Sequence, residues 1–139
     1  MLPRGAGRRI TGGGLDITLK VGRANNAVAS TFEVVVPAGF DVGAHVHTEG
    51  EELFYVLSGV LDILAFEPTA PSARDWRSWE SDTGQRFLRG GPGALLYVPA
   101  GCPHAFANSS DEPATMLFQA APTGHENYLQ ELADPPGRG

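Results

Sequence analysis

Apolar and polar residues alternate along much of this chain, which is the pattern of a β-strand with one buried face. The clearest stretch is 15–21, where every odd position is apolar and every even position is polar. Residues 29–36 are rich in β-branched side chains and end at Pro37, which has no backbone N–H to give to a sheet. The pattern therefore predicts strands at 15–21 and 29–36.

Shorter strands are predicted further along, between segments rich in Gly, Pro, Ser and Asp. Ser58 and Gly59 predict a tight hairpin turn between two of these strands. The predicted strands cover residues 45–48, 52–57, 60–66, 86–88, 94–98, 104–108 and 114–120. So many short strands indicate an all-β sandwich or barrel.

Trp76 and Trp79 interrupt the strand pattern. They are three residues apart, which predicts one short helical turn with both indoles on the same side. Two interpretations remain open for the pair. The indoles cover the outside of the sheet or a subunit contact, or they form a lid over a substrate.

The length of 139 residues fits one domain with a single core. In the C-terminal part, the capping-box spacing of Thr123 and Glu126 predicts a helix at 127–132, which the prolines at 135–136 would stop. The expected organisation is a flexible leader at 1–12, a single barrel domain at 13–122, and a helix with a tail at 123–139.

Composition and charge narrow the function classes. The net charge is −6 and Lys20 is the single lysine, so a nucleic-acid partner is not expected. No segment has the roughly 20 apolar residues of a membrane span, and no signal-peptide pattern follows the start, so we expect no membrane partner and a cytoplasmic location. The lone Cys102 excludes an internal disulfide framework and is expected to be a buried, inert thiol.

Three of the four histidines lie in two short stretches of the chain. His45 and His47 would point to the same side of an extended strand, and a carboxylate at Glu51 or Glu52 follows them. His104 comes from a second predicted strand. Imidazole and carboxylate groups that leave open positions on an ion are typical of metal sites used in catalysis.

Alternation from Glu52 and His104 also predicts which side chains face the metal. They would form an apolar chamber, although ordinary core packing explains any one of them equally well. The set contains no Lys or Arg, which disfavours a phosphorylated sugar or a dicarboxylate and favours a flat aromatic or polyketide-like small molecule. The predicted chamber residues are Phe32, Val34, Phe54, Val56, Phe106 and Leu117.

These two stretches resemble the motifs of the cupin family. The first, GFDVGAHVHTEGEELFYVLSG, has its fixed residues at positions 39, 45, 47, 52 and 59, and the second, GALLYVPAGCPHAFAN, has them at 93, 99, 101, 104 and 108. The resemblance implies an all-β jelly-roll barrel with a divalent metal inside it, near one mouth. Strand parity cannot choose between the two carboxylates, but the spacing to Gly59 in the cupin motif selects Glu52. The implied ligands are His45, His47, Glu52 and His104, with Glu52 as the catalytic residue.

The chemistry of the metal stays open at this stage. Fe, Mn, Ni, Co, Cu and Zn all suit such ligands. The sequence resembles the flavonol (quercetin) dioxygenase-like single-domain cupins, which implies a metal-dependent dioxygenase. A non-redox cyclase, isomerase or lyase is one alternative, and a non-catalytic binding protein is another.

Three further expectations concern residues outside the metal site. Leu53, Tyr55 and Leu57 form an apolar stripe on the sheet face opposite the metal, so we expect a homodimer joined through sheet faces or an exchanged N-terminal strand. Asn108 is expected to hydrogen-bond the backbone of its turn. His125, outside both motifs, is expected to be a surface residue.

Overall fold

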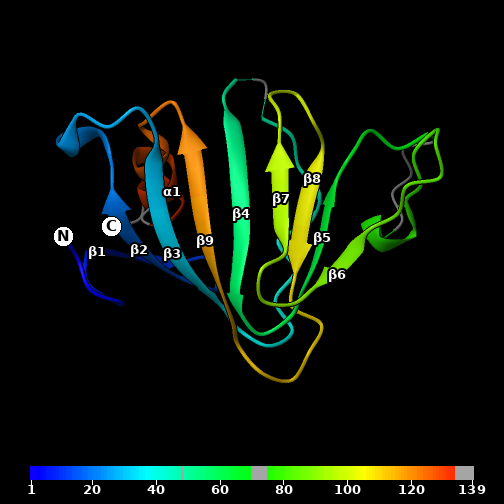
Figure 1. Cartoon of the computed structure of the whole chain (residues 1–139), viewed down its shortest axis with the longest axis horizontal. Helices are drawn as coiled ribbons and strands as arrows, with labels where there is room; N and C mark the ends of the chain where they lie inside the picture. The colour runs from blue at the N-terminus through cyan, green and yellow to red at the C-terminus, as the bar shows by residue number, and fades with distance from the viewer. Residues whose placement is uncertain (48, 70–74, 134–139) are drawn as a thin grey trace.

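Two facing β-sheets and one helix make up this computed structural model, which describes residues 1–47, 49–69 and 75–133 (Figure 1). The large sheet has the strand order β1 (Arg8–Gly12), β2 (Leu15–Val21), β3 (Ser30–Val36), β9 (Ala114–Ala121), β4 (Glu51–Ser58) and β7 (Leu95–Val98). The small sheet has the order β6 (Leu88–Gly90), β5 (Leu61–Ala65) and β8 (His104–Ala107). Two 3-10 turns, η1 (Arg23–Asn25) and η2 (Trp76–Ser78), and the helix α1 (His125–Ala133) complete the described elements.

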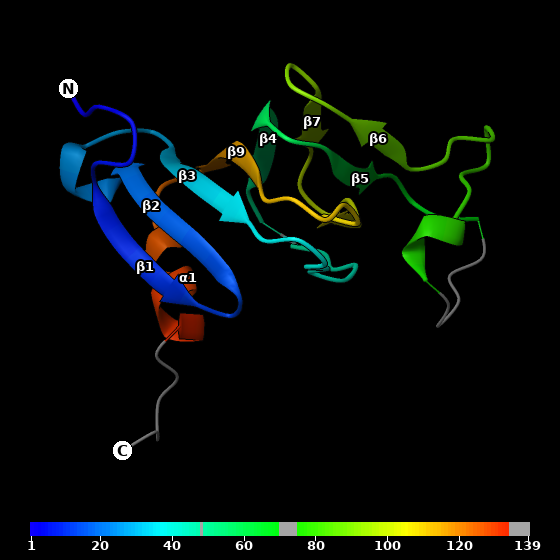
Figure 2. The same ribbon diagram turned by 90° about the horizontal axis from the view of Figure 1, so that it is seen from below.

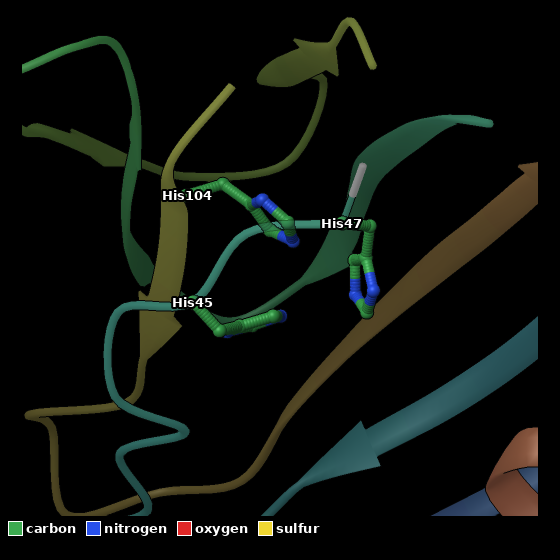
Figure 3. A group of neighbouring side chains, drawn as sticks. All are labelled: His45, His47 and His104. Atoms are coloured by element: carbon green, nitrogen blue, oxygen red, sulfur yellow. The ribbon is translucent and has the colours of Figure 1, made fainter. Parts of the chain in front are cut away.

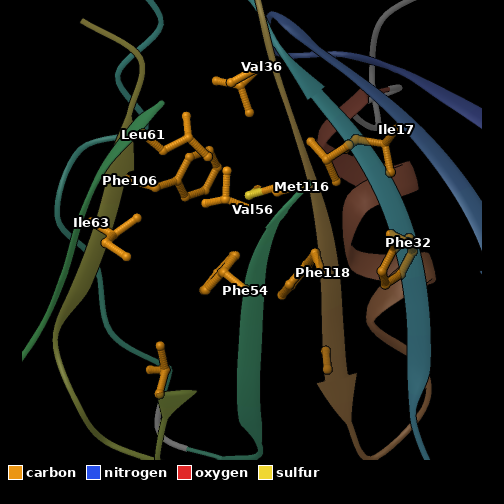
Figure 4. Packing of buried hydrophobic residues seen from close by; sticks show 14 of the residues in the cluster. Ile17, Phe32, Val36, Phe54, Val56, Leu61, Ile63, Phe106, Met116 and Phe118 are labelled. Atoms are coloured by element: carbon orange, nitrogen blue, oxygen red, sulfur yellow. The ribbon is translucent and has the colours of Figure 1, made fainter. Parts of the chain in front are cut away.

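The main core lies between the inner faces of the two sheets (Figure 4). Phe54 of β4 and Phe106 of β8 approach across this space, with ring centroids 5.5 Å apart. Within the large sheet, Phe118 of β9 stacks on Phe54 at 4.8 Å and on Phe32 of β3 at 5.4 Å. Neighbouring strands thus place three aromatic rings in one row, and this row forms a continuous apolar wall.

The large sheet extends beyond the small one at its β1–β3 side. Helix α1 lies against that side in both views (Figures 1 and 2), and its Leu129 packs on the main core. A sheet face left open to water would expose its apolar side chains, so the helix replaces the missing part of the second sheet. The predicted jelly-roll architecture with a short C-terminal helix is confirmed.

Long-range strand pairing changes two of the sequence predictions. Residues 8–12, predicted within a flexible leader, form β1 and pair antiparallel with β2, so the sheet begins before residue 13. Residues 52–57 and 60–66 do not form a hairpin. β4 pairs with β7 and β9, whereas β5 pairs with β6 and β8, so the turn at Gly59 carries the chain from one sheet to the other.

The strand predicted at 45–48 is a single bridge between His45 and His104, and residue 48 lies outside the described residues. The other strands appear within a few residues of their predicted positions. The C-terminal helix is longer than 127–132, and the prolines predicted to stop it also lie outside the described part of the chain.

The predicted helical turn at the tryptophans is the 3-10 turn η2. Trp76 is buried and Trp79 packs beside it against Leu64 and Ala105 of the small sheet, in a cluster separate from the main core. Of the two open interpretations, this arrangement agrees with covering the outside of the sheet. Neither indole lines the cavity described below.

Candidate metal centre

Three imidazoles converge at one end of the space between the sheets (Figure 3). His45 and His47 come from the loop before β4, and His104 opens β8. The backbones of His45 and His104 are joined by two hydrogen bonds, of 3.0 and 2.9 Å between nitrogen and oxygen. One ring nitrogen from each residue lies within 4.8 Å of the other two. This backbone bridge therefore holds His45 beside His104, at the position where the sequence predicted a strand over residues 45–48.

Backbone carbonyls orient two of the rings. His45 Nδ1 lies 3.1 Å from the carbonyl oxygen of Gly43, and His104 Nδ1 lies 3.0 Å from that of Cys102. A carbonyl oxygen can only accept a hydrogen bond, so Nδ1 carries the proton in both rings. The Nε2 lone pairs of the neutral rings remain available to a ligand, as in metal sites with oriented histidines.

The carboxylate beside the histidines is Glu52. Its two oxygens lie 3.1 Å from His47 Nε2 and 3.4 Å from His104 Nε2, and the residue is only 6% exposed. Glu51 is exposed on the opposite face, where it accepts a 2.6 Å hydrogen bond from the Tyr97 hydroxyl. The structure therefore puts Glu52, and not Glu51, at the centre.

Burial and charge act in opposite directions on these groups. Burial raises the pKa of Glu52, but the neighbouring His104 and His47 outweigh it, and the net pKa is lowered. Burial lowers the pKa of His104, but Glu52 and the Cys102 carbonyl outweigh it, and the net pKa is raised. Burial dominates at His45, whose pKa is lowered. The centre therefore combines the carboxylate of Glu52, whose ionised form is favoured, with the imidazole of His45, whose neutral form is favoured.

The donor set fits a divalent metal ion. His104 Nε2 is buried and makes no hydrogen bond within the described chain, an arrangement that costs free energy unless a ligand satisfies the atom. Three imidazole nitrogens and one carboxylate suit first-row transition metals. Among the described residues, the three histidines have donor atoms that all lie within 4.8 Å of one another. Glu52 contacts two of these histidines, His47 and His104.

A cavity of about 420 Å³ opens from His45, His47 and Glu52 into the space between the sheets. Val34, Phe54 and Phe106 line it as predicted. Phe32 and Val56 are fully buried in the main core and do not line it.

The prediction for Leu117 is wrong. Along β9 the inward positions are Met116 and Phe118, which line the cavity, and Leu117 lies on the outer face between Glu33 and Tyr55. Alternation along β9 already favours this arrangement, because the inward set is wholly apolar, whereas Leu117 shares its face with Thr115 and Gln119.

Several cavity residues were missed from the sequence, among them two polar side chains of α1. His125 and Tyr128 lie on α1 and line the cavity, and the ring of His125 is 5.7 Å from that of His47 between centroids. The expectation that His125 is a surface residue is therefore wrong, because α1 folds back over the cavity. Burial is the main reason that the pKa of His125 is lowered.

The second motif is held by Asn108, as predicted. Its buried amide donates to the backbone carbonyls of Val36 at 3.0 Å and Glu112 at 2.7 Å, and its side-chain oxygen accepts from the backbone of Ser110. Cys102 is half-buried rather than fully buried. Burial raises the pKa of its thiol, which agrees with an unreactive side chain.

The match to a family model agrees with this architecture. The model described as Cupin matches residues 19–133, so the chain belongs to the cupin family. A search of curated proteins finds no match.

Solved structures share the fold at low sequence identity. Oxalate decarboxylase of Bacillus subtilis is 22% identical, with a TM-score of 0.62 over 84% of this chain and 28% of that one. A Thermotoga maritima protein described as a predicted oxalate decarboxylase is 15% identical, with a TM-score of 0.59 over 78% and 80%. The protein TT1209 of Thermus thermophilus is 23% identical, with a TM-score of 0.52 over 68% and 72%. Mn(II) centres are described for the B. subtilis enzyme.

The one α-helix in the described part of the chain, α1, is too short to cross a membrane.

Proposed function

We propose that this cupin is a metal-dependent oxygenase of the flavonol dioxygenase-like kind, which acts on an aromatic or polyketide-like small molecule. One observation carries the proposal. Three imidazoles and a buried carboxylate meet at the end of an apolar cavity of about 420 Å³, large enough for a small organic substrate.

His45, His47, His104 and Glu52 would hold the metal. A bound metal with open positions would supply electron exchange with dioxygen or polarisation of a substrate oxygen. The protein supplies the rest. The carbonyls of Gly43 and Cys102 keep two rings in the binding orientation, and the phenylalanine row excludes water from the space beside them.

The lining of the cavity supports an apolar substrate with few charges. No Lys or Arg belongs to its described lining, and Glu52 adds negative charge. A dianion such as oxalate, the substrate named for two of the structural neighbours, would have no cationic side chain to receive it. A flat ring would pack against the edges of Phe54 and Phe118, which stack on each other and both line the cavity.

A non-redox cyclase, isomerase or lyase is the second candidate. The half-buried imidazole of His125 in the cavity favours it, because such reactions need a group that can move a proton. The metal would then act as a Lewis acid alone.

The test begins with protein purified without a metal-affinity tag, whose metal content is measured. Iron(II)-loaded protein is then mixed with quercetin as the flavonol probe, with and without dioxygen, and with His104→Ala as the metal-free control. Quercetin loss matched by dioxygen uptake, and absent without dioxygen, supports the oxygenase. Turnover without dioxygen supports the second candidate, binding without turnover indicates a binding protein, and absence of metal refutes the metal-centred proposal.

We also propose a homodimer joined through the outer face of the large sheet. Tyr55 and Leu57 of β4 are 39% and 45% exposed, and Leu95 and Tyr97 of the adjacent β7 are 53% and 52% exposed. This apolar surface is larger than the predicted stripe, because β7 pairs beside β4 at the sheet edge. A second copy would cover it with the same residues about a two-fold axis. The cytoplasmic location stays a prediction.

A further inference from the structure

His125 occupies a position in the cavity that packing alone does not explain. Its ring contacts Phe118 edge-on at 5.2 Å and Phe32 at 6.2 Å between centroids. A phenylalanine would make the same edge contacts, so this aromatic packing does not itself require an imidazole. The described part of the chain shows no hydrogen bond from the His125 ring nitrogens, and they are not enclosed in the core but open to the cavity. The residue therefore presents a hydrogen-bonding group to the cavity.

Hydrogen bonds of the neighbouring residue fix the position of His125. It begins α1, and the next residue, Glu126, is buried and accepts hydrogen bonds from the Ser30 hydroxyl, the Arg23 backbone and the Gly124 backbone. On its other side the ring meets Tyr128 at 5.3 Å. A polar group held in this way needs no reordering when a ligand arrives, which is the property of a preorganised contact.

The position also relates His125 to the metal centre. Its ring lies 5.7 Å from that of His47 and nearly perpendicular to it, at 85°. It is not one of the clustered histidines, whose ring nitrogens lie within 4.8 Å of one another. A molecule bound at the centre would thus meet the imidazole of His125 beside its attachment point, on the side of the phenylalanine row.

We propose that His125 is a substrate-contacting residue, which hydrogen-bonds a second oxygen of an aromatic substrate whose first oxygen is held at the metal centre. This inference rests on the proposed function. It narrows the substrate class to rings that carry two neighbouring oxygens, such as a catechol or a hydroxy-ketone. A ring with one oxygen would leave His125 without its partner.

Binding of two chromogenic probes to zinc(II)-loaded protein tests the inference without turnover. 4-Nitrocatechol carries two neighbouring oxygens, and 4-nitrophenol carries one. In His125→Phe we expect the Kd of 4-nitrocatechol to rise about tenfold, the effect of losing one hydrogen bond. The Kd of 4-nitrophenol should change less than about twofold, because that probe has no second oxygen to lose a partner. His125→Gln, which restores a hydrogen-bonding group, should bind the catechol within about threefold of the parent.

Asn127→Ala is the matched control, because Asn127 is exposed on the same helix, and it should bind both probes as the parent does. Equal catechol binding by His125→Phe and the parent overturns the inference, as does an equal loss for both probes or a loss of zinc from the variant. A zinc-loaded parent that does not prefer the catechol overturns it too. A parent that holds no metal refutes the proposed function as well, and so differs from the other failures. His125→Leu replaces His125→Phe if that variant does not fold.

Discussion

The carboxylate of Glu126 attaches helix α1 to the barrel, and its removal should loosen the cavity wall. It is 5% exposed. It accepts hydrogen bonds from the Ser30 hydroxyl, from the backbone N–H of Arg23 at 2.8 Å and from that of Gly124 at 2.9 Å. These donors belong to β3, to η1 and to the turn before α1. One charged group thus joins the helix to β3 and to the connection between β2 and β3.

The magnitude follows from the pKa of Glu126. Burial opposes ionisation, but the hydrogen bonds from Ser30 and the backbone outweigh it and lower the pKa from 4.5 to about 2. Since a difference of one pH unit corresponds to about 1.4 kcal/mol, the ionised carboxylate stabilises the folded state by about 3 kcal/mol. The contribution is complete above pH 4.5 and is lost as the pH falls from there through about 2.

Glu126→Gln should therefore lower the free energy of unfolding at pH 7 by about 3 kcal/mol, and the melting temperature by roughly 10 °C. Urea unfolding followed by circular dichroism at pH 7 and at pH 3 measures both the size and the pH dependence. The difference between variant and parent should shrink at the lower pH, because the parent then loses part of the stabilisation that its ionised carboxylate provides.

Glu112→Gln is the control, because Glu112 is exposed and only its backbone carbonyl accepts hydrogen bonds. It should leave stability at pH 7 unchanged within about 0.5 kcal/mol. A Glu126→Gln difference below about 1 kcal/mol at pH 7, or one that is the same at pH 3 and pH 7, would refute the argued role of the charge.

Three further predictions test the metal centre, the dimer and the turn between the sheets. Glu52→Ala should lose most bound metal by elemental analysis, whereas Glu51→Ala should keep it, and the reverse result would move the carboxylate by one residue. Leu95→Glu should convert the dimer to a monomer in light scattering, because a charge cannot be buried at the apolar face, and a monomeric parent would contradict the dimer itself. Gly59→Ala should cost about 2 kcal/mol in urea unfolding, because φ is +76° and a Cβ would lie 2.8 Å from the neighbouring strand, and Gly39→Ala, with φ +79° and open space, should cost about 1 kcal/mol.

The features that depend only on local residue spacing could be predicted from the sequence. The alternation at 15–21 predicted β2 at its full extent, and the two motifs identified the three histidines that converge. Parity left Glu51 and Glu52 equivalent, because the strand is apolar on both faces, and it was the resemblance to cupins that favoured Glu52. The structure agrees, since Glu52 lies 3.1 Å from His47.

The features that depend on which distant segments pair were determined only by the tertiary structure. The turn at Gly59 reads as a hairpin locally, but its two strands find partners in different sheets. The placement of Leu117 is different, because it alternates with Phe118 and shares its face with Thr115 and Gln119, so the pattern of β9 itself favours an outward position. His125 gives no local sign of its place in the cavity, because the helix that carries it is positioned by contacts with residues about 100 positions earlier. Pattern determines which residues can share a face, and long-range packing determines what that face meets.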